Sequence, residues 1–460
     1  MALQIFDSKL QSIRAFSPLE AGKVSLYVCG PTVQSAPHVG HLRSAVAFDL
    51  VARWLRLGNG LDVRMVRNVT DIDDKILVNA AEQGVDWQAL ARDVEEVFNQ
   101  VYESINASVE FRPHATDHIA DMIELIELLI SRGHAYAATD GSGNVFFDAG
   151  SWPNYGELTN QKLENLEGEA DASHGRKNPH DFALWKSTKA DEPESAAWPS
   201  PWGSGRPGWH IECSAMTRAI LGEAFDIHGG GLDLRFPHHE NELAQSHAAG
   251  FEFANYWMHN GLVTVGGQKM SKSLGNGVSV EELFEQGSAN AIRYWLGSAH
   301  YRTTLDYSPE NIADAVGAMS RIQNFVKRAS AKSSTSQKFN ADALPQPFVD
   351  AMNNDFGVPA ALAALHDSVR AGNAALDSGG DVSSHLASVL SMLEVLGLTV
   401  DEAVEVDEEL AARVGSLIEQ RRAARDNKDF ALADQIRDEL QQMGVTIEDT
   451  PTQTTWSLNG

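Results

Sequence analysis

One stretch of the chain, Leu26 to His41, limits the possible folds more than any other part of the sequence. It has the pattern of a buried strand, a tight Gly-Pro turn and the first turn of a helix, whose apolar residues recur at helical spacing to Leu57. A helix that begins directly after a strand points backbone N–H groups and the positive end of its dipole into a cleft, where phosphate binds readily. His38 and His41 add hydrogen-bond donors at this place. The stretch therefore predicts a binding site for a nucleoside triphosphate.

The order of strands and helices indicates an α/β fold with a parallel sheet. After a helix predicted at about residues 40–57, Val63 to Thr70 has the pattern of the next strand, and a further strand is predicted at 224–227. This order is typical of doubly wound, Rossmann-like folds, whose ligands gather at the carboxyl ends of the strands. Asp71 and Asp73 follow the second strand directly, where each can face a ligand or cap a helix.

Other segments depart from this pattern. Thr116 to Gly133 is predicted as an amphipathic helix capped by Thr116, and a hairpin that turns at 141–143 follows it. Residues 150–208 are polar and rich in turn residues, which indicates an insertion outside the sheet. From about residue 280 the pattern is almost wholly helical, and a short hairpin is predicted from Val445 to Trp456.

Composition and charge restrict the class of protein. A chain of 460 residues is too long for one ordinary core, and 43% hydrophobic with 22% charged residues is typical of a soluble globular protein. The sequence has no apolar run of the roughly 18 residues that a membrane span needs and no signal peptide, so we expect a cytoplasmic protein without a membrane partner. The net charge of −27 argues against non-specific binding of nucleic acid, but local basic patches can still dock a polyanion.

Two cysteines, Cys29 and Cys213, are predicted at the edges of the cleft. His238 and Glu242 are four residues apart, so their side chains share one face of a helix. Two thiolates, an imidazole and a carboxylate form a reasonable zinc site, whereas His239 points about a quarter-turn away and is a weaker alternative ligand. A disulfide is the other interpretation, which a reducing compartment disfavours. Because zinc binds a thiolate far better than a hydroxyl, such a site would separate cysteine from serine.

A second cationic segment can serve the phosphates. Lys269-Met-Ser-Lys-Ser273 is flanked by glycines and predicts a cationic loop, for which a solvated surface turn is the alternative. Lys269 and Lys272 could neutralise charge on the β- and γ-phosphates as pyrophosphate leaves. Gly40, between the two histidines, lets a nucleotide base or ribose approach the backbone because it lacks a side chain.

These motifs lead to a known family. His38-Val-Gly-His41 and Lys269-Met-Ser-Lys-Ser273 resemble the HIGH and KMSKS motifs of class I aminoacyl-tRNA synthetases. Longer segments resemble the cysteinyl-tRNA synthetases within that class, and the resemblance runs nearly from end to end. These segments are 27–33, 67–74, 207–216, 225–231, 236–242, 428–434 and 448–456.

The resemblance implies roles for individual residues. The zinc ligands in the family match the four residues that the chemistry above favours, Cys29, Cys213, His238 and Glu242. The amino-acid pocket is expected around Thr70, Trp209 and His228. The residues expected to act on ATP are His38, Gly40, His41, Lys269 and Lys272. Residues 34–37 depart from the Tyr-Asp version found in many relatives, and Val39 replaces the usual Ile.

The activity implied is that of a cysteine–tRNA ligase. Such an enzyme converts L-cysteine and ATP, with Mg²⁺, to cysteinyl-adenylate and pyrophosphate, and then transfers cysteine to the 3′ end of tRNA(Cys). We expect one Zn²⁺ per chain and a monomer. The segments expected are a Rossmann-like catalytic domain in two halves (1–111 and 201–266), a connective insertion (112–200), a KMSKS-bearing stem-contact region (267–328), a helical bundle (339–400) and a small mixed anticodon-binding unit (401–460).

Three alternatives remain open at this stage. The cysteine ligase of mycothiol biosynthesis shares the catalytic motifs but resembles a synthetase without an anticodon-binding end, and this chain has about 60 residues after 400. A non-catalytic RNA-binding paralogue would be expected to have lost His38, His41 or Lys272. A zinc hydrolase would need a His-Glu-X-X-His helix, which the sequence lacks. For tRNA, we expect a positive path along 412–437 and the arginines of 293–321.

Overall fold

The computed structural model describes residues 2–165, 175–270, 277–333, 338–400, 408–427, 429–443, 445–449 and 454–458. The chain divides into two compact units, Met1–Thr399 and Val400–Gly460. Within the described ranges, no helix is both long and apolar enough to cross a membrane.

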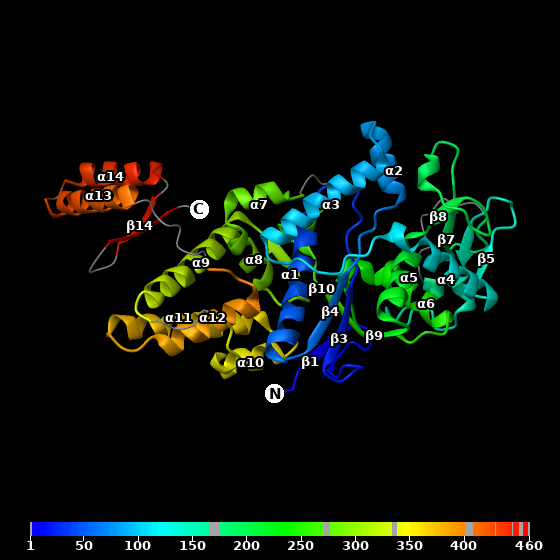
Figure 1. Cartoon of the computed structure of the whole chain (residues 1–460), viewed down its shortest axis with the longest axis horizontal. Coiled ribbons are helices and arrows are strands. Elements are labelled where there is room, and N and C mark those ends of the chain that lie inside the picture. The colour runs from blue at the N-terminus through cyan, green and yellow to red at the C-terminus, as the bar shows by residue number, and fades with distance from the viewer. Residues whose placement is uncertain are drawn as a thin grey trace. The chain divides into compact units, whose positions relative to one another are not determined.

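A four-stranded parallel sheet lies at the centre of the first unit, with the strand order β10-β9-β3-β4 (Figure 1). The strands are β3 (Lys23–Val28), β4 (Asp62–Arg67), β9 (Ala224–Gly231) and β10 (Phe253–Asn260). Helix α1 (Val39–Arg53) connects β3 to β4 and continues as a wide turn to Gly58. The predicted Rossmann-like sheet is therefore confirmed.

Close packing of α1 on the sheet depends on a glycine. A Cβ atom on Gly229 of β9 would lie 2.2 Å from the ring of Phe48 in α1, so only glycine allows this approach. Leu42 and Val46 of α1 are fully buried. The helix that carries the two histidines at its start is therefore fixed against the sheet.

Between β4 and β9 the chain forms a separate antiparallel sheet with the order β5-β6-β7-β8. Its strands are β5 (Ala135–Ala137), β6 (Val145–Phe147), β7 (Phe182–Ser187) and β8 (Gly205–Pro207). The hairpin predicted around 141–143 joins β5 and β6. Residues 150–208 lie outside the parallel sheet, as expected, but they contribute β7 and β8 to this antiparallel sheet. Short strands between proline-rich turns leave too few alternating residues for sequence periodicity to detect.

The helices around the two sheets are α2 (Asp74–Gln83), α3 (Trp87–Ser104), α4 (Ile119–Ser131), α5 (Trp209–Leu221) and α6 (Glu240–Ala248). The prediction that Thr116 caps the fourth helix is wrong. Thr116 lies in a short 3₁₀ turn before α4, where its N–H and hydroxyl both donate to the carboxylate of Asp71, at 3.0 and 2.5 Å. Asp73, not Asp71, caps α2 by accepting from the N–H of Lys75.

The rest of the first unit is mostly helical. It contains α7 (Val280–Gln286), α8 (Ala289–Ser298), α9 (Pro309–Ser330), α10 (Gln346–Asn353), α11 (Val358–Asp377) and α12 (Ser383–Leu396). This unit also contains a three-stranded sheet, β12-β11-β13, and its strand β13 departs from the helical pattern expected after about residue 280. Its strands are β11 (Val263–Val265), β12 (Gln268–Lys269) and β13 (Leu305–Tyr307). A hairpin of β1 (Gln4–Asp7) and β2 (Ser12–Ala15), which was not predicted, precedes the parallel sheet.

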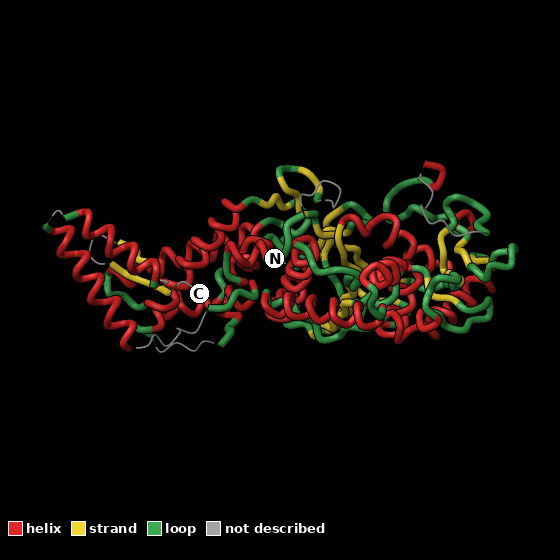
Figure 2. Tube along the Cα trace, turned by 90° about the horizontal axis from the view of Figure 1, so that it is seen from above, coloured by secondary structure: helices red, strands yellow, loops and turns green. Residues whose placement is uncertain are grey.

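The second unit has its own small core. Helices α13 (Glu408–Asp426) and α14 (Phe430–Gln442) and the hairpin of β14 (Val445–Asp449) and β15 (Thr454–Leu458) agree with the predicted helices and terminal hairpin (Figure 2). The buried residues that hold the unit together are Val414, Leu417, Ile436, Leu440 and Val445.

Candidate active site

Four side chains that could hold a metal meet at the carboxyl end of β3. Cys29 follows β3, Cys213 comes from α5, His238 from the turn before α6, and Glu242 from α6 itself. Their ligand atoms all lie within 4.8 Å of one another. The Sγ atoms of the cysteines are 3.7 Å apart, Cys29 Sγ is 3.4 Å from Glu242 Oε1, and His238 Nε2 is 3.1 Å from the same oxygen. The structure thus brings all four predicted ligands together.

The two cysteines are free thiols. Their sulfur–sulfur distance of 3.7 Å is far longer than the bond of about 2.05 Å in a disulfide. The alternative interpretation of this pair as a disulfide is therefore wrong for this structure, and both thiols are available as ligands.

A second set of possible ligands overlaps the first. Cys29, His228, His239 and Glu242 also form a group that could hold a metal. His228 Nε2 lies 2.8 Å from Glu242 Oε2, and His239 Nδ1 lies 2.8 Å from His259 Nε2. The sequence predicts that His239 points away from the other ligands. The turn at 235–239 is not regular helix, however, and His238 and His239 are both buried. A quarter-turn argument requires regular helix on both sides of the residue.

Burial sets the protonation of this cluster. It raises the pKa of the Cys29 thiol well above its usual range and lowers that of His238 to about 3. Burial also acts to raise the pKa of Glu242, but the adjacent His228 and His238 outweigh it and the net shift is downward. At neutral pH the imidazole is neutral and the carboxylate charged, as metal ligands must be. A thiol loses its proton when it coordinates a cation.

The three predicted pocket residues lie beside these ligands. The ring of Trp209 stacks on that of His238, with centroids 4.2 Å apart. Thr70 Oγ1 donates to Glu212 Oε2 at 2.9 Å, and Glu212 directly precedes the ligand Cys213 in the sequence. His228 Nε2 contacts Glu242 Oε2, as described above. Glu212 is 1% exposed, and sequence reasoning missed it. Its place beside a predicted ligand was the one available signal.

The two signature histidines cap α1. His38 Nδ1 accepts from the N–H of Gly40, and His41 Nδ1 accepts from the N–H of His38, both at 3.1 Å. Because Nδ1 is the acceptor in each ring, the neutral form carries its proton on Nε2. Burial and the adjacent His38 lower the pKa of His41 to about 3. A Cβ atom on Gly40 would lie 3.0 Å from the ring of His38, so this glycine also makes room for the cap.

The lysine-bearing segment begins within the three-stranded sheet. Lys269 ends β12, whereas Lys272 lies outside the described residues. Beyond the undescribed residues 271–276, Ser279 caps α7 and forms an antiparallel bridge with His38. The chain that follows the lysine motif therefore returns to the first histidine of the other motif.

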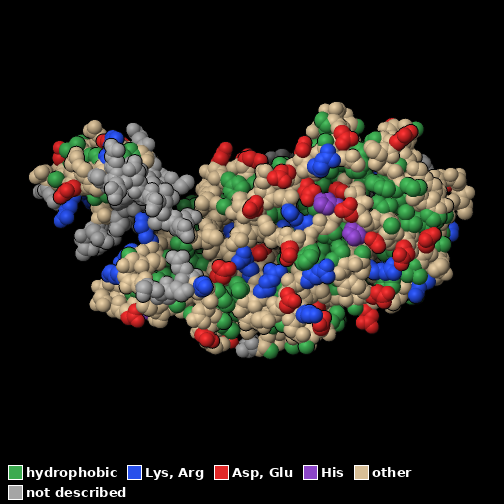
Figure 3. Space-filling view, viewed as in Figure 1, with side chains coloured by type: hydrophobic (Ala, Val, Ile, Leu, Met, Phe, Trp, Pro, Cys, Tyr) green, Lys and Arg blue, Asp and Glu red, His purple; other side chains and the backbone are tan. Residues whose placement is uncertain are grey.

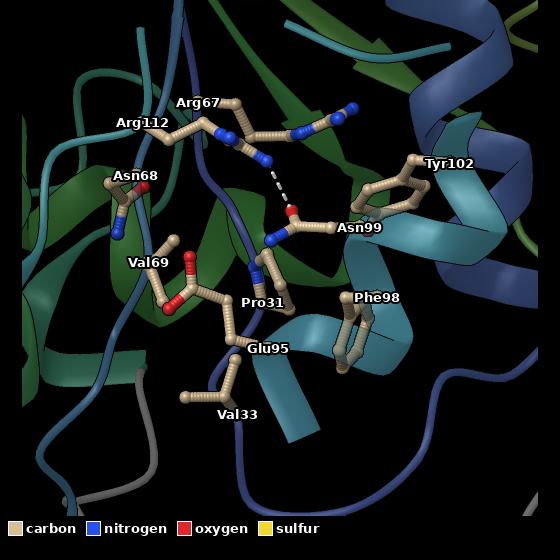
Figure 4. A pocket seen from close by; sticks show the side chains of 10 residues that line it. All are labelled: Pro31, Val33, Arg67, Asn68, Val69, Glu95, Phe98, Asn99, Tyr102 and Arg112. Carbon is tan, nitrogen blue, oxygen red and sulfur yellow. Dashed lines mark hydrogen bonds between the residues drawn. The ribbon is translucent and has the colours of Figure 1, made fainter. Parts of the chain in front are cut away.

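A small cavity of about 10 Å³ lies beside the loop between β3 and α1 (Figure 4) and has room for about one water molecule. Pro31 and Val33 line it on one side, and Phe98 and Asn99 of α3 on the other. Phe98 also contacts the ring of His41, edge to face at 5.0 Å. Figure 4 shows the side chain of Arg112 reaching Asn99 across the cavity, a bond of 2.6 Å. The cavity is too small for a nucleotide, and its walls support the histidine-bearing turn.

The predicted positive path through residues 293–321 is wrong at its first arginine. Arg293 is 1% exposed and forms an ion pair with Asp49 of α1. Its Nη1 donates to the carbonyl groups of Ile105 and Asn106, each at 2.8 Å. Arg293 therefore joins α8 to α1 and α3 and cannot contact an external polyanion.

Comparison with known proteins agrees with this architecture. Residues 15–317 match the family described as tRNA synthetases class I (C) catalytic domain, and 347–401 match the DALR domain. Methionyl-tRNA synthetase of Mycobacterium tuberculosis, solved with methionyl-adenylate, superposes with a TM-score of 0.58 at 19% identity, over 82% of this chain and 90% of that one. A leucyl-tRNA synthetase of Agrobacterium radiobacter K84, solved with tRNA, gives 0.58 at 11% identity, over 84% of each chain. The fold and catalytic domain are those of a class I aminoacyl-tRNA synthetase.

Residues 407–456 match the cysteinyl-tRNA ligase anticodon binding domain. The cysteine–tRNA ligases of Clavibacter michiganensis subsp. michiganensis and Leifsonia xyli subsp. xyli are each 52% identical to the chain, over 485 and 479 residues and 100% of both sequences. The chain therefore belongs to the cysteine–tRNA ligase family, as the motifs indicated.

Proposed function

We propose that this chain activates L-cysteine with ATP and transfers it to the 3′ end of tRNA(Cys). The observation that carries the proposal is the meeting of two thiols, an imidazole and a carboxylate within 4.8 Å, on the same loop side of the sheet as the histidine-capped start of α1. A site for a thiol-bearing amino acid and a site for a triphosphate are then neighbours. We infer a monomeric, cytoplasmic enzyme.

The donor set fits one zinc ion, held by Cys29, Cys213, His238 and Glu242. When bound, zinc would act as a Lewis acid toward the sulfur of substrate cysteine, which it would bind as a thiolate. Trp209 keeps the ring of His238 in place, and Glu212 orients the hydroxyl of Thr70 beside it. Because a hydroxyl is a much poorer zinc ligand than a thiolate, serine is excluded without an editing step.

The first step is formation of the adenylate. A carboxylate oxygen of cysteine attacks the α-phosphorus of ATP, and the bond to the β-phosphate oxygen breaks, so that pyrophosphate leaves. The Nε2–H groups of His38 and His41 stabilise the charge that develops on the phosphates, together with Lys269, Lys272 and Mg²⁺. The imidazole of His41, neutral and held by the cap, donates its bond without having to lose or gain a proton.

The second step transfers cysteine to tRNA. A hydroxyl of the terminal ribose attacks the carbonyl carbon of the mixed anhydride, and AMP leaves. No enzyme nucleophile is required, because the anhydride is already activated and positioning supplies the rate. For docking, α13 and α14 expose four arginines: Arg413, Arg422, Arg425 and Arg437. Lys and Arg side chains also lie across the middle of the first unit in Figure 3, despite the net charge of −27.

The test is ATP-dependent incorporation of labelled cysteine into acid-precipitable tRNA, with labelled serine as the matched control. We expect cysteine to be incorporated and serine refused. If cysteine drives pyrophosphate exchange but no tRNA is charged, the activation site is right and the acceptor is wrong, and an amino-sugar acceptor becomes the better candidate. If cysteine drives no exchange, the proposal fails at its first step.

A further inference from the structure

The three-stranded sheet β12-β11-β13 connects the lysine motif to a single carboxylate. Thr264 of β11 pairs with Lys269 of β12 on one side and with Asp306 of β13 on the other. Asp306, Thr264 and Lys269 thus occupy one row across the sheet. β12 has only two residues, so its own ladder gives the strand little support.

The carboxylate of Asp306 closes the turn between β11 and β12. Its Oδ1 accepts from Thr264 Oγ1 at 2.6 Å and from the N–H of Gly267 at 2.9 Å. Gly266 and Gly267 have φ angles of +59° and +74°, which glycine adopts without strain and which a tight hairpin turn requires. One oxygen atom therefore holds both the strand and the turn that lead into Lys269.

β13 is itself held by three helices. Asn311 of α9 donates to the carbonyl oxygen of Asp306 at 3.1 Å. Gln286 of α7 donates to Tyr307 Oη at 2.7 Å, and the ring of Tyr307 packs edge to face on Trp295 of α8 at 5.8 Å. Besides its pairing with β11, Asp306 is thus held in position by contacts outside the hairpin that it binds.

We propose that Asp306 is a positioning residue for the start of the KMSKS segment. It holds the β11–β12 hairpin on the helical frame, so that the backbone of the motif starts from a fixed point at Lys269. Asp306 contacts neither the zinc ligands nor the histidine cap, and its action is confined to the ATP side of the site. The role rests on the proposed function, because it assumes that this segment serves ATP.

The experiment separates the hydrogen bonds from the charge. Asp306→Asn keeps an Oδ1 that can accept both bonds, whereas Asp306→Ala removes them. In cysteine-dependent pyrophosphate exchange, Asp306→Ala should lower kcat/KM for ATP about tenfold, and Asp306→Asn should stay within about twofold of the original chain. KM for cysteine and zinc content should not change. Asp314→Ala is the matched control, an exposed carboxylate on the adjacent helix α9.

A readout without catalysis keeps the inference apart from the proposed function. Amide hydrogen exchange at Gly267 should speed up in Asp306→Ala and in Thr264→Val but not in Asp306→Asn. Equal loss in Asp306→Asn and Asp306→Ala would show that charge matters rather than the clamp, and would overturn the proposal. So would unchanged exchange at Gly267, or a similar loss in Asp314→Ala. If the original chain drives no pyrophosphate exchange, the proposed function fails, while the Gly267 measurement still decides whether Asp306 holds the hairpin.

Discussion

The two halves of the candidate site are built in different ways. On the metal side, Cys213, His238 and Glu242 are at most 1% exposed, and each comes from a buried element packed on the sheet. On the phosphate side, His38 is exposed at the start of a helix, and Asp306 holds a two-residue strand from the surface. Under the proposed roles, selection of the amino acid depends on a cluster formed by the core, whereas ATP chemistry depends on a helix start and a short strand that are each held by two hydrogen bonds.

This difference predicts different responses to substitution. A buried cluster of four donors works as a unit, because removal of one leaves the other buried polar groups unsatisfied. On the phosphate side, the effect of a substitution at His38 or Asp306 should be proportional to the bond removed, because these two residues are exposed and their surroundings can relax. The buried Arg43 of α1, whose Nη2 donates to the carbonyl of His300 at 2.7 Å, keeps the helix itself in place under both halves.

The largest effect is expected from Cys213→Ser. A serine hydroxyl is a poor zinc ligand. Mutation of a residue that only hydrogen-bonds to a metal ligand typically lowers metal affinity or activity 10- to 100-fold, and loss of a ligand itself should lower them further. We expect zinc content to drop and cysteine-dependent pyrophosphate exchange to fall by at least about 100-fold, as measured by metal analysis and exchange rate. Ser214→Ala, one residue further along α5, is the control and should keep both. If Cys213→Ser kept its full zinc content and its full exchange rate, the assignment of Cys213 as a zinc ligand would be wrong.

A smaller, more specific effect is expected at His41. In His41→Asn, the side-chain oxygen can still accept the bond from the N–H of His38, but no donor replaces Nε2–H. In His41→Gln, the amide N–H replaces Nε2–H as a donor, but the acceptor for His38 is lost. If Nε2–H stabilises the phosphates, His41→Asn should lower kcat of adenylate formation by about 100-fold and His41→Gln by about tenfold. The measurement is pyrophosphate exchange at saturating cysteine and ATP. The reverse order would mean that His41 serves the helix cap rather than the reaction.

The comparison also explains what sequence alone could predict. Leu26 to His41 indicated the sheet and the helix start correctly because strand, turn and apolar spacing all lie within one short stretch. The four ligands could be chosen because cysteine is rare here and its chemistry is specific. Contacts between distant segments could not be predicted. The sequence predicts Arg293 as a surface cation, whereas the structure buries it in an ion pair with Asp49. Thr116, predicted to cap a helix, instead donates to Asp71. Periodicity describes one element, not what packs on it.

The smallest effect is expected in the pH dependence of His41, which should not titrate in the assayed range. Burial lowers the pKa of His41 from 6.5 to about 3, so His41 is neutral throughout the range in which the enzyme can be assayed. The pH profile of adenylate formation from pH 5.5 to 8 should then have the same shape in the original chain and in His41→Gln. Between pH 6.5 and 3 the unfolded chain binds a proton at His41 that the folded chain does not, so the contribution of this residue to stability decreases as pH falls. Lowering the pH from 7 to 5 should therefore decrease the Tm of the unsubstituted protein more than that of His41→Gln, as measured by thermal unfolding at each pH. An inflection near pH 6.5 that disappears in His41→Gln would show instead that His41 takes up a proton in the assayed range and does not act as a neutral donor.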